Sequence, residues 1–204
     1  IVLIFDECTS GFRETYGGLH LKYKVAPDMA IFGKALGNGY AISAIIGREN
    51  IMESAQETFI SSTFWTERVG PTAALKTLEV MEREKSWEII TANGKYIKSS
   101  WIKLAKENDL KITTFGLDAL AGFTFDSKYA LEYKTLISQE MLKKGYLAST
   151  NCISCTEHTK EIINNYINEL EYTFKLIKKV ENDEISLDSV LDTPVCHTGF
   201  NRLN

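Results

Sequence analysis

Apolar residues in the first part of the chain form short runs that alternate with glycine-containing loops. Residues 1–5 (IVLIF) are one continuous apolar run, residues 29–33 a second, and residues 41–46 a third. Short, β-branched apolar runs bounded by loops are typical of strands in an α/β sheet. We therefore expect three strands here, the first of them a parallel strand buried on both faces.

A helical pattern follows at Pro71. Proline suits the first turn of a helix, where its missing N–H costs nothing. Apolar residues then recur at helical spacing, at Ala73, Leu75, Leu78 and Met81. We expect a helix that begins at Pro71.

From residue 86 onward the pattern is that of a smaller α+β domain. Residues 87–108 predict a long amphipathic helix, and residues 111–115 and 119–125 predict two strands joined at Gly116. Helices are expected at 128–144 and 157–180, with Gly145 at a C-cap position. The sequence thus predicts an α/β domain over residues 1–85 and a small domain over residues 86–204.

The first residues carry a further expectation. The chain has no initiator methionine, and its opening apolar strand needs neighbours on both sides. We expect a further N-terminal portion in the whole protein.

Composition excludes several function classes. The 204 residues are 44% hydrophobic and carry a formal net charge of -4, with acidic and basic side chains interspersed. Such a chain has no basic face for nucleic acid. No apolar run is long enough to cross a bilayer, and the first residues do not resemble a signal peptide. We expect a cytoplasmic protein with neither nucleic-acid nor membrane partners.

Four cysteines raise the alternative of a zinc-binding module without catalytic activity. Cys152 and Cys155 form a C-x-x-C, His158 follows, and Cys196 with His197 could supply further ligands. The second half of such a site is only an adjacent pair, whereas zinc ribbons show two complete knuckles. Reduced thiols and no metal are the favoured prediction.

Three charged residues adjoin the apolar runs. Asp6 and Glu7 follow the first run, at the edge where α/β sheets bind ligands, and Lys34 lies between the second run and the glycines of Gly37-Asn38-Gly39. Taken alone, Asp6 fits a helix cap as well as a ligand site. Taken alone, Lys34 is more typical of a solvated surface group than of a catalytic amine, although the neighbouring glycines would let backbone approach a ligand closely.

The combination of motifs is more specific than any single one. FDECTSGFR at 5–13, PD at 27–28, GKALGNGY at 33–40, GR at 47–48 and STFW at 62–65 resemble the signature series of class III aminotransferases, and most closely that of glutamate-1-semialdehyde 2,1-aminomutases. The resemblance implies the α/β fold of pyridoxal-phosphate (PLP) transferases, fold type I. Residues 1–85 would be part of the large cofactor-binding domain.

The resemblance also implies residue roles. Lys34 would form the Schiff base with PLP and move the α-proton of a small amino substrate, and Asp6 would hold the pyridine nitrogen protonated. Thr63 would reach the cofactor phosphate of a neighbouring subunit, which implies a homodimer with shared active sites. Glu7 would orient the loop.

The resemblance is compatible with two reactions. The leading prediction is the intramolecular amino shift of glutamate-1-semialdehyde. The alternative is an intermolecular aminotransferase that uses a keto acid or a ketosugar of a polysaccharide pathway. Glu67, within Thr66-Glu67-Arg68, departs from the Gly-Asn-Pro of the aminomutases and could bear on the substrate. Because this family's N-terminal half supplies the phosphate loop and the aromatic that stacks on the cofactor, the 204 residues alone should be inactive.

Overall fold

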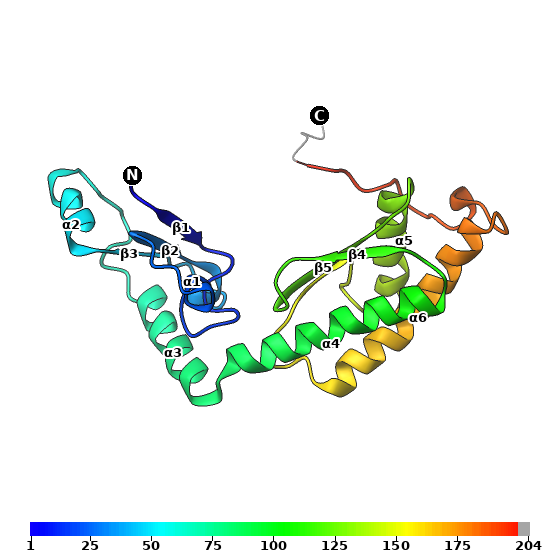
Figure 1. Ribbon diagram of the computed structural model, residues 1–204, viewed down its shortest axis with the longest axis horizontal. Coiled ribbons are helices and arrows are strands. Elements are labelled where there is room, and N and C mark those ends of the chain that lie inside the picture. Colours follow the sequence, from blue (N-terminus) through cyan, green and yellow to red (C-terminus); the bar gives the residue numbers. More distant parts are fainter. Residues whose placement is uncertain (200–204) are drawn as a thin grey trace. The chain divides into compact units, whose positions relative to one another are not determined.

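The computed structural model describes residues 1–199, and the chain forms two compact units, the first Ile1–Thr91 and the second from Ala92 onward (Figure 1). Residues 200–204, which belong to the expected domain 86–204, lie outside the described residues. The domain boundary at residue 85 stays a prediction of the sequence. Within residues 1–199, no helix combines the length and the apolar character that crossing a membrane requires.

The first unit contains a sheet of three strands in the order β1-β2-β3: β1 (Ile4–Glu7), β2 (Met29–Phe32) and β3 (Ala44–Gly47). β1 and β2 are parallel, and β3 is antiparallel to β2. All three expected strands are therefore present. The first begins and ends later than its apolar run.

The expected burial of the first strand is wrong for this chain. Ile1 to Ile4 are exposed, with relative accessibilities from 43% to 127%. The reason is that β1 is an edge strand. Among the described residues it pairs with β2 on one side, and its other edge and much of its surface are uncovered.

The first unit also contains one long helix and several short helical segments. They are α1 (His20–Tyr23), the 3-10 segment η1 (Lys34–Leu36), α2 (Glu49–Met52), the 3-10 segment η2 (Glu53–Glu57) and α3 (Val69–Glu84). Ala74 of α3 joins Ala30, Phe32 and Leu36 in the buried core of this unit. The short helices α1 and α2 were not predicted, because one turn is too short to show a helical period.

The helix expected at Pro71 begins two residues earlier, at Val69. The carboxylate of Glu67 accepts hydrogen bonds from the backbone N–H groups of Val69 and Gly70, the latter at 3.1 Å. These contacts satisfy free N–H groups at the helix start and place a negative charge near it. Pro71 lies within the first turn, as its chemistry requires.

The second unit is a three-stranded antiparallel sheet packed against helices. The strands are β4 (Ile112–Phe115), β5 (Leu120–Phe125) and β6 (Asn151–Ile153), and the helices are α4 (Ser86–Glu107, which starts in the first unit), α5 (Ala130–Lys143) and α6 (Lys160–Glu181), followed by the 3-10 segment η3 (Leu187–Ser189). The predicted helices and the two predicted strands are confirmed. β6 was missed, because three residues carry no readable alternation.

One face of this sheet forms the larger core. The aromatic rings of Phe123 and Phe125 lie within 6.1 Å of Phe174 of α6, and Phe123 lies 4.8 Å from Trp101 of α4, measured between ring centroids. All four of these side chains are buried. This unit therefore has its own aromatic core.

Candidate functional site

The carboxyl ends of β1 and β2 lie at one edge of the sheet, because the two strands are parallel. Asp6 lies opposite Ile31 in this pairing, and Lys34 follows two residues after Phe32, where β2 ends. The pKa of Asp6 is lowered chiefly by hydrogen bonds from Cys8 and to a lesser extent by the charge of Lys34. The structure thus brings together two of the residues that the sequence singles out, 28 positions apart.

The backbone around Lys34 is firmly held. Phe32 and Leu36 on either side of it are buried in the core, whereas the Lys34 side chain is exposed. Lys34 itself has a φ of 42°, in the left-handed region that residues with side chains rarely adopt. Such conformations are often found at functional sites, where the surrounding structure maintains them.

The amine of Lys34 has a specific partner. Its Nζ donates a hydrogen bond to Oγ1 of Thr9 at 2.5 Å. Sequence reasoning did not single out Thr9, although it lies within the FDECTSGFR motif. The loop after β1 therefore contributes a hydroxyl to the edge where Asp6 and Lys34 meet.

Asp6 is a carboxylate at neutral pH. Its pKa is lowered chiefly by the backbone N–H of Cys8, which donates to Oδ1 at 3.0 Å, then by the Cys8 thiol, and to a lesser extent by the charge of Lys34. A carboxylate of this kind can hold a proton on a nearby basic nitrogen. The alternative of a helix-capping role has no support, since β1 leads into a loop.

Glu7, unlike the exposed Asp6, is buried, with 3% of its surface exposed. Its two oxygens accept hydrogen bonds from the Ser10 hydroxyl at 2.6 Å, from the backbone N–H groups of Leu19 at 2.8 Å and His20 at 2.9 Å, and lie 3.0 Å from Nδ1 of the His20 ring. Burial raises the pKa of Glu7, but the hydrogen bonds from Ser10, Leu19 and His20 outweigh it and lower the pKa overall. Glu7 therefore organises the loop between β1 and α1.

Thr63 lies apart from this cluster. It is exposed, in the loop between η2 and α3, and no hydrogen bond within residues 1–199 joins it to Asp6 or Lys34. Large apolar side chains near it are also exposed, namely Phe59 (96%), Phe64 (75%) and Trp65 (66%). An apolar surface of this kind is typical of an interaction site.

Contacts within the chain explain the position of the Glu67 side chain, and no substrate is needed for it. Both of its carboxylate oxygens are engaged by the N–H groups that begin α3. The departure from Gly-Asn-Pro at 66–68 thus has a local structural role in this chain.

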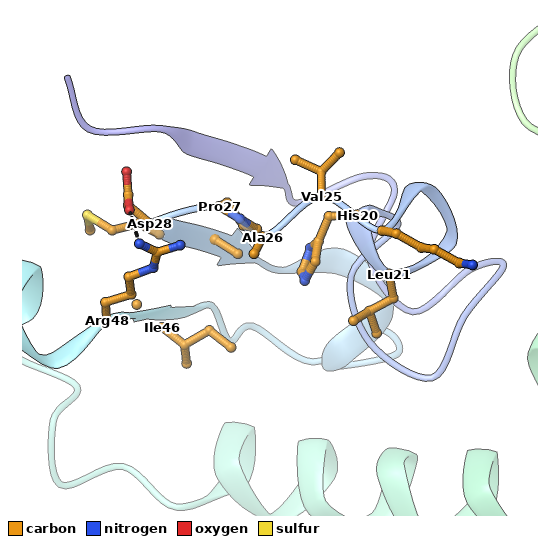
Figure 2. Close-up of a pocket in the computed structure, with 12 residues that line it drawn as sticks. His20, Leu21, Val25, Ala26, Pro27, Asp28, Ile46 and Arg48 are labelled. Atoms are coloured by element: carbon orange, nitrogen blue, oxygen red, sulfur yellow. Dashed lines mark ion pairs between the residues drawn. The ribbon is translucent and has the colours of Figure 1, made fainter.

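A pocket of about 500 Å³ lies elsewhere in the first unit, near the beginning of β2 (Figure 2). Its lining includes His20, Leu21 and Ile46, and an ion pair of 3.1 Å joins Arg48 to Asp28 at its side. Neither Asp6 nor Lys34 lines this pocket. Asp6 and Lys34 lie toward the other end of β2. The candidate site is therefore at the carboxyl edge of the sheet and not in this pocket.

The cysteines do not form a metal centre in the described part of the chain. No three His, Cys, Asp or Glu side chains within residues 1–199 are grouped so that they could hold a metal ion. Burial is the main cause that raises the pKa of the Cys152 thiol, which favours its neutral form. The zinc-binding alternative therefore finds no support in these residues.

Comparison with known proteins places these motifs in context. The family model for class III aminotransferases matches residues 1–179. The chain is 32% identical over 191 residues to a 3-aminobutyryl-CoA aminotransferase of Cloacimonas acidaminovorans, covering 87% of this chain and 43% of that protein. It is 29% identical over 142 residues to a glutamate-1-semialdehyde 2,1-aminomutase of Natranaerobius thermophilus, covering 68% of this chain and 33% of that protein.

Solved structures share the fold. The FumI protein of Sphingopyxis sp. MTA144, in a form that carries PLP, superposes with a TM-score of 0.79 at 20% identity, over 88% of this chain and 44% of its own. The expected fold class, part of the α/β fold of PLP-dependent transaminases, is therefore confirmed. The chain spans less than half the length of the curated relatives it matches.

Glu7→Gln should destabilise the protein by about 2 kcal/mol at pH 7, because the amide nitrogen of glutamine cannot accept the hydrogen bonds that the carboxylate accepts. Since the folded pKa of Glu7 lies below its ordinary value of 4.5, the carboxylate stabilises fully above pH 4.5. The difference between wild type and variant should therefore shrink as the pH falls through the lowered pKa. Urea unfolding at several pH values measures this, with Glu53→Gln, an exposed position, as the control. A variant as stable as wild type at pH 7 would contradict the role of Glu7.

Proposed function

The chain belongs to the class III aminotransferase family, and from that premise we propose that the protein containing it transfers amino groups with PLP held by Lys34 and Asp6. The observation that carries the proposal is the position of this amine and this carboxylate at the carboxyl ends of two neighbouring parallel strands. Ligands of open α/β sheets bind at that edge.

The residues present fit the cofactor. When bound, PLP supplies an aldehyde that exchanges amines and a pyridine ring that accepts an electron pair from the substrate. The exposed amine of Lys34 suits covalent attachment of the aldehyde. Asp6, with its lowered pKa, offers the negative charge that a protonated pyridine nitrogen requires.

Two tasks then fall to side chains of this chain. Asp6 holds the proton on the ring nitrogen throughout the reaction, because a carboxylate with a lowered pKa does not take that proton for itself. The neutral amine of Lys34 would accept the proton from the substrate α-carbon and return it at the position where the product requires it.

The transfer is, in our first choice, intermolecular. The match to a 3-aminobutyryl-CoA aminotransferase, at 32% identity over 87% of this chain, favours a reaction with separate amino donor and acceptor. The second candidate is the intramolecular shift of glutamate-1-semialdehyde, favoured by the match to an aminomutase at 29% identity. A keto acid is the expected acceptor for the first reaction, and a ketosugar stays a prediction of the sequence.

We further propose a homodimer in which Thr63 serves the cofactor phosphate of the neighbouring subunit. Two observations support this. Thr63 is exposed and therefore accessible to a second subunit, and the side chains of Phe59, Phe64 and Trp65 in the same loop are exposed apolar surface.

The whole protein, loaded with PLP, should carry the cofactor on Lys34. Borohydride should fix a pyridoxyl group to the peptide that contains Lys34, and mass spectrometry detects it. Lys34→Ala should abolish both fixation and turnover, since the amine is needed for attachment and for proton transfer. Lys24→Ala, an exposed lysine in the same unit, is the matched control and should retain both. Fixation on another lysine, or none at all, would refute the proposal.

The same preparation separates the two reactions. An intermolecular aminotransferase should stop after one turnover until a keto acid is added, because the amino group stays on the cofactor. An aminomutase should convert glutamate-1-semialdehyde without any added acceptor. Continued turnover without an acceptor would therefore exclude our first choice in favour of the second.

Asp6→Asn should leave the fold intact and lower turnover by about a hundredfold or more, since one preorganised charge facing the reacting system contributes that much. Circular dichroism and steady-state kinetics on the whole protein measure the two effects. Asp28→Asn, at the opposite end of β2, should leave turnover nearly unchanged. A near-normal rate in the Asp6 variant would show that the carboxylate does not act on the ring.

Thr63→Ala should weaken retention of PLP by about tenfold, the effect of one hydrogen bond to a charged group, without unfolding the subunit. Dialysis followed by absorbance measures the retained cofactor, and sedimentation measures the dimer. Thr58→Ala, in the same loop with its hydroxyl bonded to the Ala55 carbonyl, is the control. A fully active monomer would contradict the shared site.

A further inference from the structure

One contact at the site has no role in the chemistry described so far. The Lys34 amine donates to the Thr9 hydroxyl at 2.5 Å, and neither cofactor attachment nor the charge of Asp6 calls for that partner. Thr9 is otherwise exposed on the loop that follows β1, so burial does not explain why its side chain lies there.

The position of Thr9 is fixed by the loop on both sides. The Ser10 hydroxyl donates to buried Glu7 at 2.6 Å, and the backbone N–H of Gly11 donates to the Glu7 carbonyl at 2.8 Å. Gly11 lies so close to Phe32 that an added Cβ would be 2.6 Å from its ring. The loop therefore has little freedom to move Thr9 away from Lys34.

Arg13 supports the same residue from further along the loop. Its Nε donates to the Thr9 carbonyl at 3.4 Å, and the guanidinium has no carboxylate within ion-pair distance among residues 1–199. The half-buried side chain thus contacts the backbone of Thr9 rather than an acidic group.

A hydroxyl suits an amine that must take up and release a proton. It accepts a hydrogen bond from an N–H of the amine whether the amine is charged or neutral, which leaves the single lone pair of the neutral amine free to take up a proton. A carboxylate in the same place would favour the charged form alone. A lysine side chain also has several rotatable bonds, and a fixed partner reduces the number of directions in which its amine points.

We propose that Thr9 is a positioning residue that directs the amine of Lys34 during proton transfer. The proton leaves the substrate carbon and adds to the lone pair of Nζ, while Thr9 accepts a hydrogen bond from an N–H of the amine before and after the transfer and neither gains nor loses a proton. The proposal rests on the function proposed above for Lys34. Its test is chosen so that the two can fail separately.

The test compares Thr9→Val, which removes the hydroxyl at nearly constant shape, with Thr9→Ser, which keeps it. In the cofactor-free whole protein, competitive acetylation of Lys34, read by mass spectrometry of its peptide, should rise about fivefold in the valine variant, because the amine has lost one hydrogen bond. The serine variant should label like wild type. Lys24 serves as the internal reference, since it lies outside this contact.

A kinetic measurement complements the labelling. In the loaded protein, Thr9→Val should lower kcat by about fivefold with little change in KM for the amino substrate, and Thr9→Ser should recover most of that loss. Should the valine variant fail to fold, Thr9→Ala removes the same hydroxyl and is expected to give the same two results.

The outcomes separate the two proposals. Cofactor fixed on Lys34, together with unchanged labelling and kcat in the variants that lack the hydroxyl, would overturn the role of Thr9 alone. Cofactor fixed on another lysine would overturn both. If Thr9→Ser behaves like wild type while Thr9→Val and Thr9→Ala show the altered labelling and kcat, the hydroxyl and not the loop shape is the cause.

Discussion

The parallel pairing of β1 with β2 is the constraint on which the site depends. It brings the carboxyl ends of two strands to one edge, with Asp6 opposite Ile31 and Lys34 just beyond Phe32. A slip of this pairing by one residue would turn Asp6 to the other face of the sheet, because successive side chains alternate between faces. The buried rings and methyl groups on the core face, Phe32 and Ala30 among them, maintain the register through packing.

Three acidic residues of the first unit have different physical roles, which follow from their burial and their hydrogen bonds. Glu7 is buried with its hydrogen bonds satisfied, so it holds the loop in place. Glu67 gives both oxygens to the start of α3. Asp6 is exposed at the sheet edge, with a lowered pKa and the charge of Lys34 nearby, and is therefore the carboxylate available to a ligand.

The two units differ in how completely they bury their apolar residues. The second unit encloses Trp101, Phe123 and Phe174 in an aromatic core. The first unit has a small core and leaves Ile4, Ile45 and Trp65 exposed. These exposed apolar side chains lie in the unit that also carries Asp6 and Lys34, so this unit has surface that is suited to further packing.

The sequence by itself determined the strand runs, the longer helices and the motif series that indicates the family, because hydrophobic periodicity and residue identity are local properties. Only the tertiary structure decided that Lys34 contacts Thr9, 25 residues earlier, and that Glu7 holds the turn into α1. It also showed that Glu67 caps α3 and that β6 joins the second sheet. Hydrogen bonds between distant residues leave no periodic signal, and a three-residue strand is stable only beside its neighbour.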